Sequence, residues 1–447
     1  MILPPEAAPL VAALTPAFTQ PTAQRFVTLL TAALLTTGRR TVANLLRTLG
    51  PLVGGHRTTY QRVLSRAPWS AAALGCALAG FLLRHLLPEG PVVVVGDDTV
   101  EGHPGPHVYG KARHRDPVRS THSHTAWRYG HKWVVLAVLV RFPFATRRWA
   151  LPVLVALYRA PALSRAEGRP HRTPAQLMCR LLRLLLWRCP DRTFVFVGDA
   201  GFGSHEVARF CHRHRRRLTL VSKLHPDANL FDPPPPSRGP RRGRPPVKGR
   251  RRRKPRHAAA RAKTRPSLQV DWYGGGTRRV EIVTEAAHWF KAGQGLVPLR
   301  WVFVRDRTGT HRDEYFFTTD AALTPAQIIG LYGGRWNIET TFQECRSSLG
   351  LETTRGWGRA TVSRAAPCLF GLYSVVALLY HVLPAEHRSG AVTWPGKTGV
   401  TFSDALAAVR RRLWAEGIFA QADAAGDLGK FPPALRELLL TALAPAP

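Results

Sequence analysis

Two short apolar runs, each followed by Gly-Asp, constrain the fold more than any other feature of the sequence. Residues 92–95 precede Gly96-Asp97, and residues 194–197 precede Gly198-Asp199. Continuous apolar runs of this length are typical of strands that are buried on both faces. Such strands need helices on both sides, so the runs predict an α/β domain. We expect each acid where its strand ends, and the two carboxylates converge if the strands are neighbours.

The rest of the chain predicts a mixed sheet with an insertion. Further strands are expected over 132–142, 148–157 and 218–221, and helices over 173–187 and from Ser204. This order predicts an α/β domain with a mixed sheet. Between residues 223 and 324 the α/β order is interrupted by four strand-like segments, at 268–272, 279–284, 299–305 and 314–319. A β-rich insertion is therefore expected before a helix that begins at Pro325 and runs to about Leu349.

Both ends of the chain are expected to be helical. In the first 88 residues, a short helix, a glycine-rich connection and a second helix leave two interpretations open. One is a helix-turn-helix in which Arg40, Arg57, Thr58 and Arg62 contact DNA, and the other is an ordinary helical bundle with solvated arginines.

Near the C-terminus, residues 366–383 are apolar enough to suggest a membrane span. They are barely long enough and are interrupted by polar and glycine residues, so we favour a buried helix.

The charge of the chain favours a polyanionic partner. Lys and Arg number 64 against 28 Asp and Glu, which gives a formal net charge of +36. Nucleic acid is the first candidate for that partner, and an anionic membrane surface is the second. The tract 238–265 holds 14 Lys or Arg and no acid, which predicts a mobile loop that faces DNA. Six scattered cysteines without a C-x-x-C pair indicate free thiols in a reducing cytoplasm.

Four polar residues recur at helical spacing after the insertion. Offsets of 3, 7 and 14 residues from the first place them within roughly 60° of one another on a helix, as Tyr332, Arg335, Glu339 and Arg346. A core stripe would be apolar, whereas an acid between two guanidinium groups fits a site that holds a metal and a phosphodiester. Carboxylate ligands with few His or Cys nearby point to Mg²⁺, with Mn²⁺ as the other choice.

These motifs resemble those of insertion-sequence DDE transposases, a branch of the RNase H-like and retroviral-integrase superfamily. The signature Y-x2-R-x3-E-x6-K is matched at its first three positions, and Arg346 stands in place of Lys. Asp97-Asp98-Thr99 matches Asp-x-Thr, and residues 198–202 match Gly-Asp-x-Gly-[Phe/Tyr]. The resemblance covers about residues 91–350. It implies an RNase H-like core that is interrupted by a β-rich insertion before the catalytic Glu.

The resemblance also implies an activity and its participants. A transposase of this kind cuts double-stranded DNA at transposon ends and joins the 3′ ends to target DNA. Two Mg²⁺ ions would be held by Asp97, Asp199 and Glu339. Tyr332, Arg335 and Arg346 would contact DNA, and two chains would act together as a homodimer on DNA. We expect a cytoplasmic, nucleoid-associated prokaryotic protein with no membrane partner.

Some members of this branch form a DNA hairpin at the transposon end, and a Trp in the insertion stacks on a flipped base. Trp289 and Trp301 are the candidates here, although a Trp in a β domain is more often part of the core.

For the first metal ligand we choose Asp97 over Asp98. Adjacent residues in a strand point to opposite faces, so only one of them can face Asp199.

Five regions follow from these expectations. They are a helical DNA-binding region (1–88), the first part of the core (89–222), the insertion with a basic Pro/Arg-rich loop at 232–265 (223–324), the helix with the catalytic Glu (325–357) and a helical C-terminal region (358–447). Two other functions stay open: a non-catalytic DNA-binding protein derived from a transposase, and another RNase H-like DNA nuclease. The presence of all three acids argues against the first, and the arginine stripe and the insertion are unusual for the second.

Overall fold

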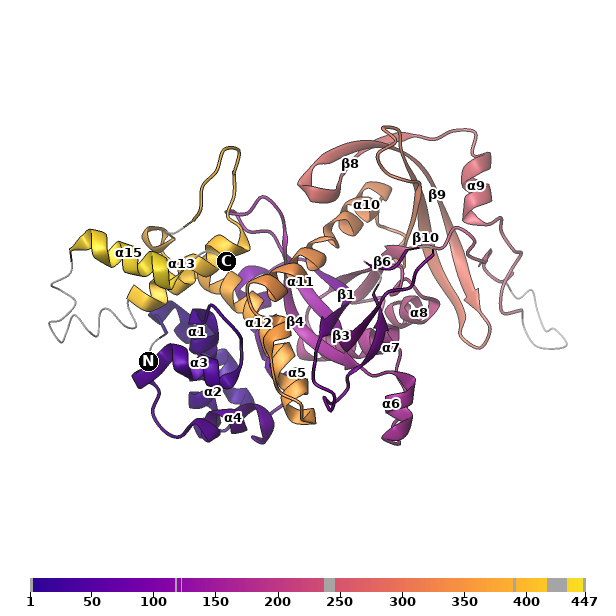
Figure 1. Cartoon of the computed structure of the whole chain (residues 1–447). Helices are drawn as coiled ribbons and strands as arrows, with labels where there is room; N and C mark the ends of the chain where they lie inside the picture. The colour runs from indigo at the N-terminus through magenta and orange to yellow at the C-terminus, as the bar shows by residue number, and fades with distance from the viewer. Residues whose placement is uncertain are drawn as a thin grey trace.

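The computed structural model describes residues 3–116, 119–121, 123–236, 246–388, 391–415 and 432–444. The sheet lies in the middle of the molecule, with helices from both ends of the chain on one side and the insertion on the other (Figure 1). Both termini lie on the side of the helices.

The central part of the sheet is mixed. β1 runs antiparallel to β3 and parallel to β5, β3 is antiparallel to β4, and β5 is parallel to β6. The order is therefore β4-β3-β1-β5-β6, with the short β2 paired to the start of β3. This arrangement confirms the expected RNase H-like mixed sheet. The strands are β1 (Val92–Gly102), β2 (Ala112–Arg115), β3 (Trp127–Val140), β4 (Trp149–Tyr158), β5 (Phe194–Gly198) and β6 (Leu218–Lys223).

The β-rich insertion is present, and it continues the same sheet. β11 pairs antiparallel with β6, and β10, β9 and β7 follow in order, with β8 on β9. In the described chain this makes one eleven-stranded sheet, because β11 satisfies the backbone groups on the free edge of β6. The elements are β7 (Leu230–Phe231), α9 (Pro255–Arg261), β8 (Ser267–Asp271), β9 (Thr277–Lys291), β10 (Gly295–Asp306) and β11 (Glu314–Thr318).

The basic tract is more ordered than a free loop. Residues 238–245 lie outside the described residues. The following part, which was expected to be a mobile loop, contains α9, and Arg251 bridges to Phe231. The acids of the insertion explain this difference, because Asp227 pairs with Lys254 at 3.2 Å and Asp232 pairs with Arg252 at 2.7 Å. The prediction of a loop is therefore wrong for the second half of the tract.

Helices cover the central strands on both faces. A Cβ on Gly96 would lie 2.5 Å from Met178, so α7 (Pro174–Arg188) packs on the face toward which residue 96 points. α8 (His205–Arg213) packs beside α7, and the short α6 (Pro161–Ala166) precedes α7 in the chain. α10 (Pro325–Gly334) and α11 (Asn337–Ser347) contact the sheet through β5, β6, β1 and β4. Capping boxes at Thr173 and Thr324 begin α7 and α10, as expected from Thr-Pro at both sites.

The helix from Pro325 is interrupted where one continuous helix was expected. α10 ends at Gly334 and α11 begins at Asn337. The amide of Arg335 bonds the carbonyl of Tyr332 at 3.0 Å, and the amide of Ile338 bonds that of Arg335 at 3.1 Å. These are i to i−3 bonds, which tighten the turn. Two consecutive glycines, at 333 and 334, weaken the helix at this point and account for the break.

Helices from the two ends of the chain pack together. α13 contacts α2, and the buried guanidinium of Arg410 donates to the carbonyls of Leu34 at 2.9 Å and Thr36 at 3.0 Å. α12 contacts β4, α5, α4 and α2. The helices are α1 (Ala8–Leu14), α2 (Gln20–Leu35), α3 (Val42–Leu49), α4 (Arg57–Ser65), α5 (Ala71–Leu86), α12 (Arg359–Val382), α13 (Phe402–Trp414) and α15 (Pro433–Leu443).

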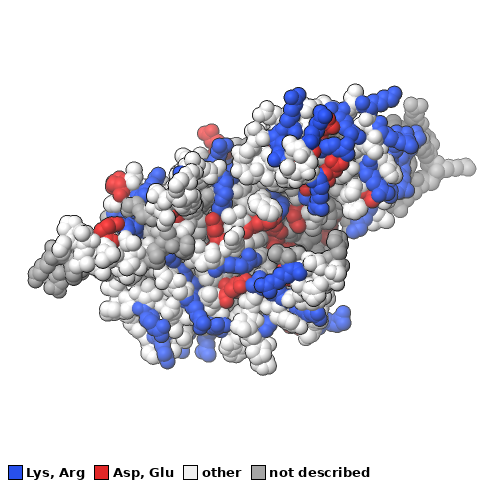
Figure 2. Space-filling view, turned by 45° about the horizontal axis from the view of Figure 1, so that its top comes forward, with Lys and Arg blue, Asp and Glu red and all other residues white. Residues whose placement is uncertain are grey.

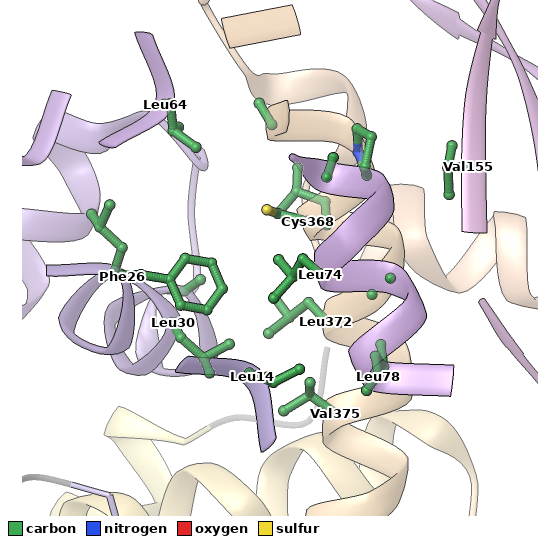
Figure 3. Close-up of a pocket in the computed structure, with 18 of the residues that line it drawn as sticks. Leu14, Phe26, Leu30, Leu64, Leu74, Leu78, Val155, Cys368, Leu372 and Val375 are labelled. Carbon is green, nitrogen blue, oxygen red and sulfur yellow. The ribbon is translucent and has the colours of Figure 1, made fainter. Parts of the chain in front are cut away.

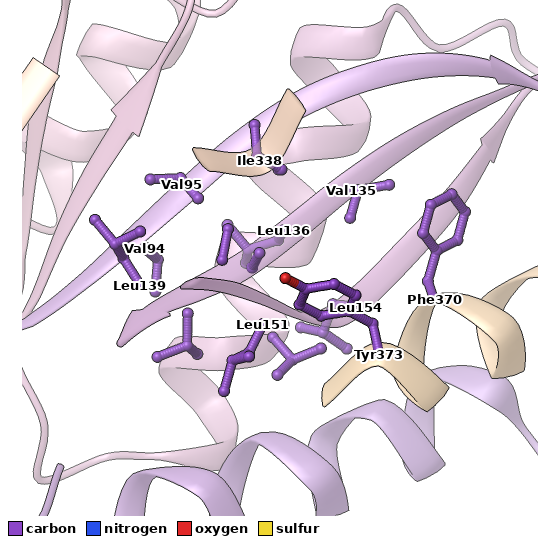
Figure 4. Packing of buried hydrophobic residues seen from close by; sticks show 14 of the residues in the cluster. Val94, Val95, Val135, Leu136, Leu139, Leu151, Leu154, Ile338, Phe370 and Tyr373 are labelled. Atoms are coloured by element: carbon purple, nitrogen blue, oxygen red, sulfur yellow. The ribbon is translucent and has the colours of Figure 1, made fainter. Parts of the chain in front are cut away.

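The long apolar helix α12 lies mostly inside the protein. By length and composition it could cross a membrane, but 67% of its most apolar window is buried. Phe370 and Tyr373 of α12 lie close to Leu154 of β4 and the neighbouring strands, while Ile338 of α11 lies near Val95 (Figure 4). The packing supports the expectation of a buried helix.

An apolar cavity of about 110 Å³ lies where α12 and α5 meet the helices α1 to α4. Phe26 and Leu30 line one side, and Leu74 and Leu372 line the other (Figure 3). Gly371 of α12 is also part of the lining. The cavity lies between helices and is lined by residues other than the carboxylates singled out by the sequence.

Candidate active site

Asp97 and Asp199 leave neighbouring strands at the same level. In the parallel register of β1 and β5, Val95 lies opposite Val197 and Gly96 opposite Gly198, so each Asp is the next residue along its strand. The expected convergence follows from this register. Asp97 does not end its strand, however, because β1 continues to Gly102 in its pairing with β3. Only Asp199 follows the last residue of a strand.

The turn after β5 fixes Asp199 by backbone bonds. Its Oδ1 accepts a hydrogen bond from the amide of Phe202 at 3.1 Å, and its carbonyl accepts one from the hydroxyl of Ser222 at 2.8 Å. A Cβ on Gly203 would lie 2.5 Å from the carbonyl oxygen of Lys223, so a side chain cannot fit there. This close approach gives a physical reason for the glycine that follows the Gly-Asp-x-Gly-Phe segment.

Arg335 joins the first acid to the third. Its Nη1 lies 2.6 Å from Oδ2 of Asp97, and its Nη2 lies 2.6 Å from Oε1 of Glu339. The side chains of Arg335 and Asp97 are 10% and 14% exposed, whereas that of Glu339 is 37% exposed. Burial would lower the pKa of Arg335, but Asp97, Tyr332 and Glu339 outweigh it and raise that pKa above its ordinary value.

Tyr332 supports Arg335 from inside the protein. Its ring is buried, lies 4.5 Å from that of Phe316, and has the guanidinium of Arg335 above it at 5.7 Å. Burial raises the pKa of Tyr332 above its ordinary value. Tyr332 is therefore placed to orient Arg335 and is not exposed for direct contact with DNA.

The electrostatics at the two aspartates favour a cation. Burial raises the pKa of Asp97 to about 7; Arg335 opposes this rise, and the charge of Asp199 adds to it. A divalent cation would offset both the burial of the carboxylate and its repulsion by Asp199. Within the described residues, no group of three or more His, Cys, Asp and Glu side chains is arranged to hold a metal ion. The two aspartates fit a divalent cation, and Glu339 would complete the set only in place of its ion pair with Arg335.

Asp98 has a different partner. Its Oδ1 lies 2.9 Å from Nζ of Lys132 on β3, and its amide donates to Oδ1 of Asp97 at 2.7 Å. Burial raises the pKa of Asp98, while Lys132 lowers it. The side chain of Asp98 is thus neutralised by a lysine of the sheet, whereas Asp97 faces the arginine of the α10–α11 turn.

A second row of polar contacts continues along β1. Arg346 at the end of α11 donates to the hydroxyl of Thr99, and its Nε lies 3.3 Å from Glu352. Glu352 also accepts from Arg128 of β3 at 2.7 Å. α11 therefore runs beside β1, with Arg335 at Asp97 and Arg346 at Thr99. Sequence reasoning missed Glu352 and Arg128, because no spacing or motif links them.

The predicted DNA contacts of the N-terminal helices divide into two kinds. Arg57 and Arg62 are exposed on α4, and Thr58 is half-buried beside them. Arg40 is buried at 6% exposure and donates to the carbonyls of Gly38 and Ser348. Burial lowers its pKa to about 10. The prediction that Arg40 contacts DNA is therefore wrong for this structure, because its guanidinium ties the N-terminal helices to the end of α11.

The two predicted stacking tryptophans are not exposed. Trp301 is 1% exposed in β10, between β9 and β11, so it belongs to the core. Trp289 is half-buried and packs edge-on against His205 and Phe317. The indole beside the candidate site is that of Trp336, which follows Arg335 directly and is 53% exposed. Exposure could not be inferred from its place in the motif.

Figure 2 shows the distribution of charge on one face. Lys and Arg lie on many parts of this surface, and Asp and Glu gather in fewer places, including the hollow at the centre of the view. On this face, basic side chains thus lie on many elements and are not confined to the basic tract.

Paired carboxylates on neighbouring parallel strands of a mixed sheet place the protein among RNase H-like α/β proteins. The chain belongs to the DDE superfamily endonucleases, whose family matches residues 13–279. The match includes Asp97 and Asp199 and ends before Glu339. Members of this superfamily generally use divalent metal ions, so the protein is a nuclease of a class that acts with such ions.

The chain is similar to piggyBac transposase in the cryo-EM structure of its synaptic complex with hairpin DNA, at 11% sequence identity and a TM-score of 0.40. The similarity covers 96% of this chain and 77% of that one. No curated protein matches the chain.

Proposed function

We propose that the protein is a transposase that cuts double-stranded DNA at transposon ends and joins the freed 3′ ends to target DNA. One observation carries the proposal: Arg335 holds Asp97 and Glu339 together, next to Asp199 on the adjacent strand. The acids, the arginine and the buried tyrosine belong to three motifs that are distant in sequence. The proposal includes membership of the insertion-sequence branch with the Y-x2-R-x3-E-x6-K signature.

In this proposal Asp97, Asp199 and Glu339 would hold two Mg²⁺ ions, whose chemistry would be to activate a water molecule and to stabilise the leaving 3′ oxygen. Asp97 and Asp199 supply ligands from rigid strands, and Glu339 supplies one from the first turn of α11. There its carboxylate also interacts favourably with the helix dipole. Without metal, Arg335 holds Asp97 and Glu339 together; once Glu339 gives up this ion pair to bind a metal ion, the guanidinium would be free to bind the phosphate that is cut. Arg346 and Thr99 lie further along β1, where the next phosphates of the strand would bind.

The departure from the signature has a structural reason. A lysine at position 346 has one donor group, whereas Arg346 contacts Thr99 and Glu352 at once. Glu352 in turn holds Arg128. The arginine thus connects α11 to β1 and, through Glu352, to β3 from two separate nitrogen atoms, whereas a lysine would have to reach both partners from one.

The test is a cleavage and joining assay with the purified full chain. The substrate is linear DNA that carries the terminal inverted repeats flanking the coding region, and a supercoiled plasmid is the target. We expect Mg²⁺-dependent release of the transposon ends and insertion into the plasmid, and neither reaction with Asp199→Asn. Binding without cutting by the wild-type protein would instead support a non-catalytic DNA-binding protein. Cutting without joining would support another RNase H-like nuclease.

The assembly on DNA is part of the same proposal. Two ends are cut together, so two chains are expected in the complex with DNA, at the nucleoid of a prokaryotic cell. The mass of the complex with end DNA, measured by light scattering, checks this stoichiometry. A complex with one chain that still joins both ends would contradict it.

A further inference from the structure

An open, strongly basic groove lies between α7 and α8. Its lining includes five arginines, three from the α7 side and two from α8: Arg172, Arg180, Arg183, Arg209 and Arg213. The other lining residues are Gln176, Cys179, Glu206, Phe210 and Gln294. Neither the carboxylate site nor the motifs of the sequence account for this concentration of one charge.

The arginines of the groove lack carboxylate partners within the described part of the chain. The acid in the lining is Glu206, and its Oε1 accepts a hydrogen bond from Gln176 at 3.2 Å. The guanidinium of Arg183 lies over the ring of Phe210 at 5.6 Å. By contrast, Arg335 forms ion pairs with two carboxylates, those of Asp97 and Glu339. Five guanidinium groups gathered around one carboxylate repel one another, and a bound polyanion would relieve that repulsion.

Neighbouring arginines affect the pKa of Arg180. Burial lowers the pKa of Arg180, and the charges of Arg172 and Arg183 lower it further. The positive neighbours thus add to the effect of burial on the pKa of Arg180. A bound anion would offset the mutual repulsion of these arginines, which remains in the free protein.

The spacing of the arginines fits an extended ligand. Arg180 and Arg183 are three residues apart on α7, which corresponds to about 4.5 Å along the axis, and Arg209 and Arg213 are separated by about 6 Å on α8. Packed helices lie about 8–10 Å apart, so the two rows face one another across the groove. Each guanidinium can donate two parallel hydrogen bonds to a phosphate. The open and polar lining suits a nucleic acid backbone better than a small apolar ligand.

The groove and the carboxylates lie on opposite faces of the sheet. Residue 96 points toward Met178 of α7, and Asp97, the next residue in the strand, points to the other face, where Arg335 binds it. A DNA segment at the carboxylates is therefore separated from the groove by the sheet itself.

We infer that the groove between α7 and α8 binds the phosphate backbone of a second duplex DNA segment, distinct from the segment at Asp97 and Asp199. The inference rests on the proposed function, because that function makes DNA the polyanion. It adds a surface on the back of the catalytic sheet.

The test compares full-length variants for binding to fluorescein-labelled duplex DNA in EDTA at a series of salt concentrations. For Arg180→Ala with Arg209→Ala, we expect weaker binding and a slope of log K against log salt that is smaller by about 1.8, because each phosphate contact contributes roughly 0.9. Arg180→Lys with Arg209→Lys keeps the charge and should restore most of the slope. The matched control is Arg141→Ala with Arg165→Ala, which removes two exposed arginines outside the groove.

The outcomes separate this inference from the proposed function. An unchanged slope in the Arg180 and Arg209 variant would overturn the groove as a DNA site, even if the wild-type protein cuts transposon ends. An equal decrease of the slope in the control variant would also overturn the groove as a DNA site, since the decrease would then come from the lower net charge of the protein. If the wild-type protein neither binds nor cuts DNA, the proposed function fails together with the inference. Asp97→Asn is expected to keep the wild-type slope while cutting is lost.

Discussion

The Nη1 atom of Arg335 lies 2.6 Å from Oδ2 of Asp97, although 238 residues separate the two in the chain. The turn between α10 and α11 delivers the arginine to the strand, and the same guanidinium holds Glu339. A contact that spans the whole insertion therefore defines the candidate site.

Glu339→Gln tests the third acid. The amide keeps the shape of the side chain and loses the charge that a metal ligand needs. Outer groups around a metal typically contribute 10- to 100-fold, so we expect the loss of a direct ligand to lower the rate of nicking more than about 100-fold. Binding of end DNA, measured by anisotropy, should stay unchanged. Nicking near the wild-type rate would remove Glu339 from the ligand set.

Asp97→Asn and Asp98→Asn form a matched pair of adjacent residues. We expect Asp97→Asn to abolish strand cleavage, because this carboxylate faces Arg335 and Asp199. Asp98→Asn should keep measurable cleavage, because the carboxylate of Asp98 is paired with Lys132. Both variants are assayed for cleavage in Mg²⁺, with DNA binding as the control. The reverse pattern would show that the register of the site is wrong by one residue.

Arg335→Ala should lower the stability of the protein itself. It leaves the carboxylate of Asp97 buried without its ion-pair partner, and breaking fully buried pairs costs about 3–5 kcal/mol. Since the partner Glu339 is partly exposed, we expect a loss of about 2 kcal/mol or more in the free energy of unfolding. Denaturant unfolding at neutral pH measures it. Arg335→Lys should lose less of the free energy of unfolding. If both variants are as stable as the wild-type protein, the ion pairs of Arg335 do not stabilise the fold.

Trp336→Ala tests the exposed indole beside the site. If that indole stacks on a base of the bound end, its removal should weaken binding of end DNA by about 1–3 kcal/mol. Trp394 has the same exposure of 53% and lies in the C-terminal region, so Trp394→Ala is the matched control. Equal affinities of Trp336→Ala and the wild-type protein would exclude stacking at this position.

Gly371→Ala should stabilise the protein. Gly371 lies within α12 beside the apolar cavity, and a Cβ there would make an ordinary contact of 3.6 Å with Leu78. Replacing glycine in a helix by alanine is worth about 0.5–1 kcal/mol. Gly75→Ala is the contrasting variant, because its Cβ would lie 2.2 Å from the carbonyl oxygen of Val153. We expect it to lower the free energy of unfolding by about 1–3 kcal/mol. Thermal melts of both variants check the signs.

Local patterns were enough to predict the strands that carry the two aspartates. The apolar runs before Gly96 and Gly198 define both strands, and Thr-Pro pairs define the starts of α7 and α10. The continuation of β1 to Gly102 could not be predicted in this way. The second half of β1 is polar. It forms a strand because β3 pairs with each of its residues from Asp97 to Gly102.

Contacts between distant segments account for the remaining differences. Arg40 has the sequence context of an exposed arginine, and its burial depends on carbonyl groups near residue 348. Trp301 and Trp336 are both tryptophans near polar residues, and only the packing of the sheet distinguishes the buried one from the exposed one. The arginine groove was missed for a similar reason: its two rows come from helices whose spacing is that of any amphipathic helix.

The continuity of the sheet through β6 and β11 has a mechanical consequence. Asp199 follows β5, β5 pairs with β6, and β6 pairs with β11 of the insertion, so hydrogen-bonded ladders connect the carboxylate to the insertion without a hinge. The insertion cannot swing as an independent body unless those ladders break. If the protein acts on DNA as proposed, a segment bound by the insertion would lie at a fixed distance from Asp199.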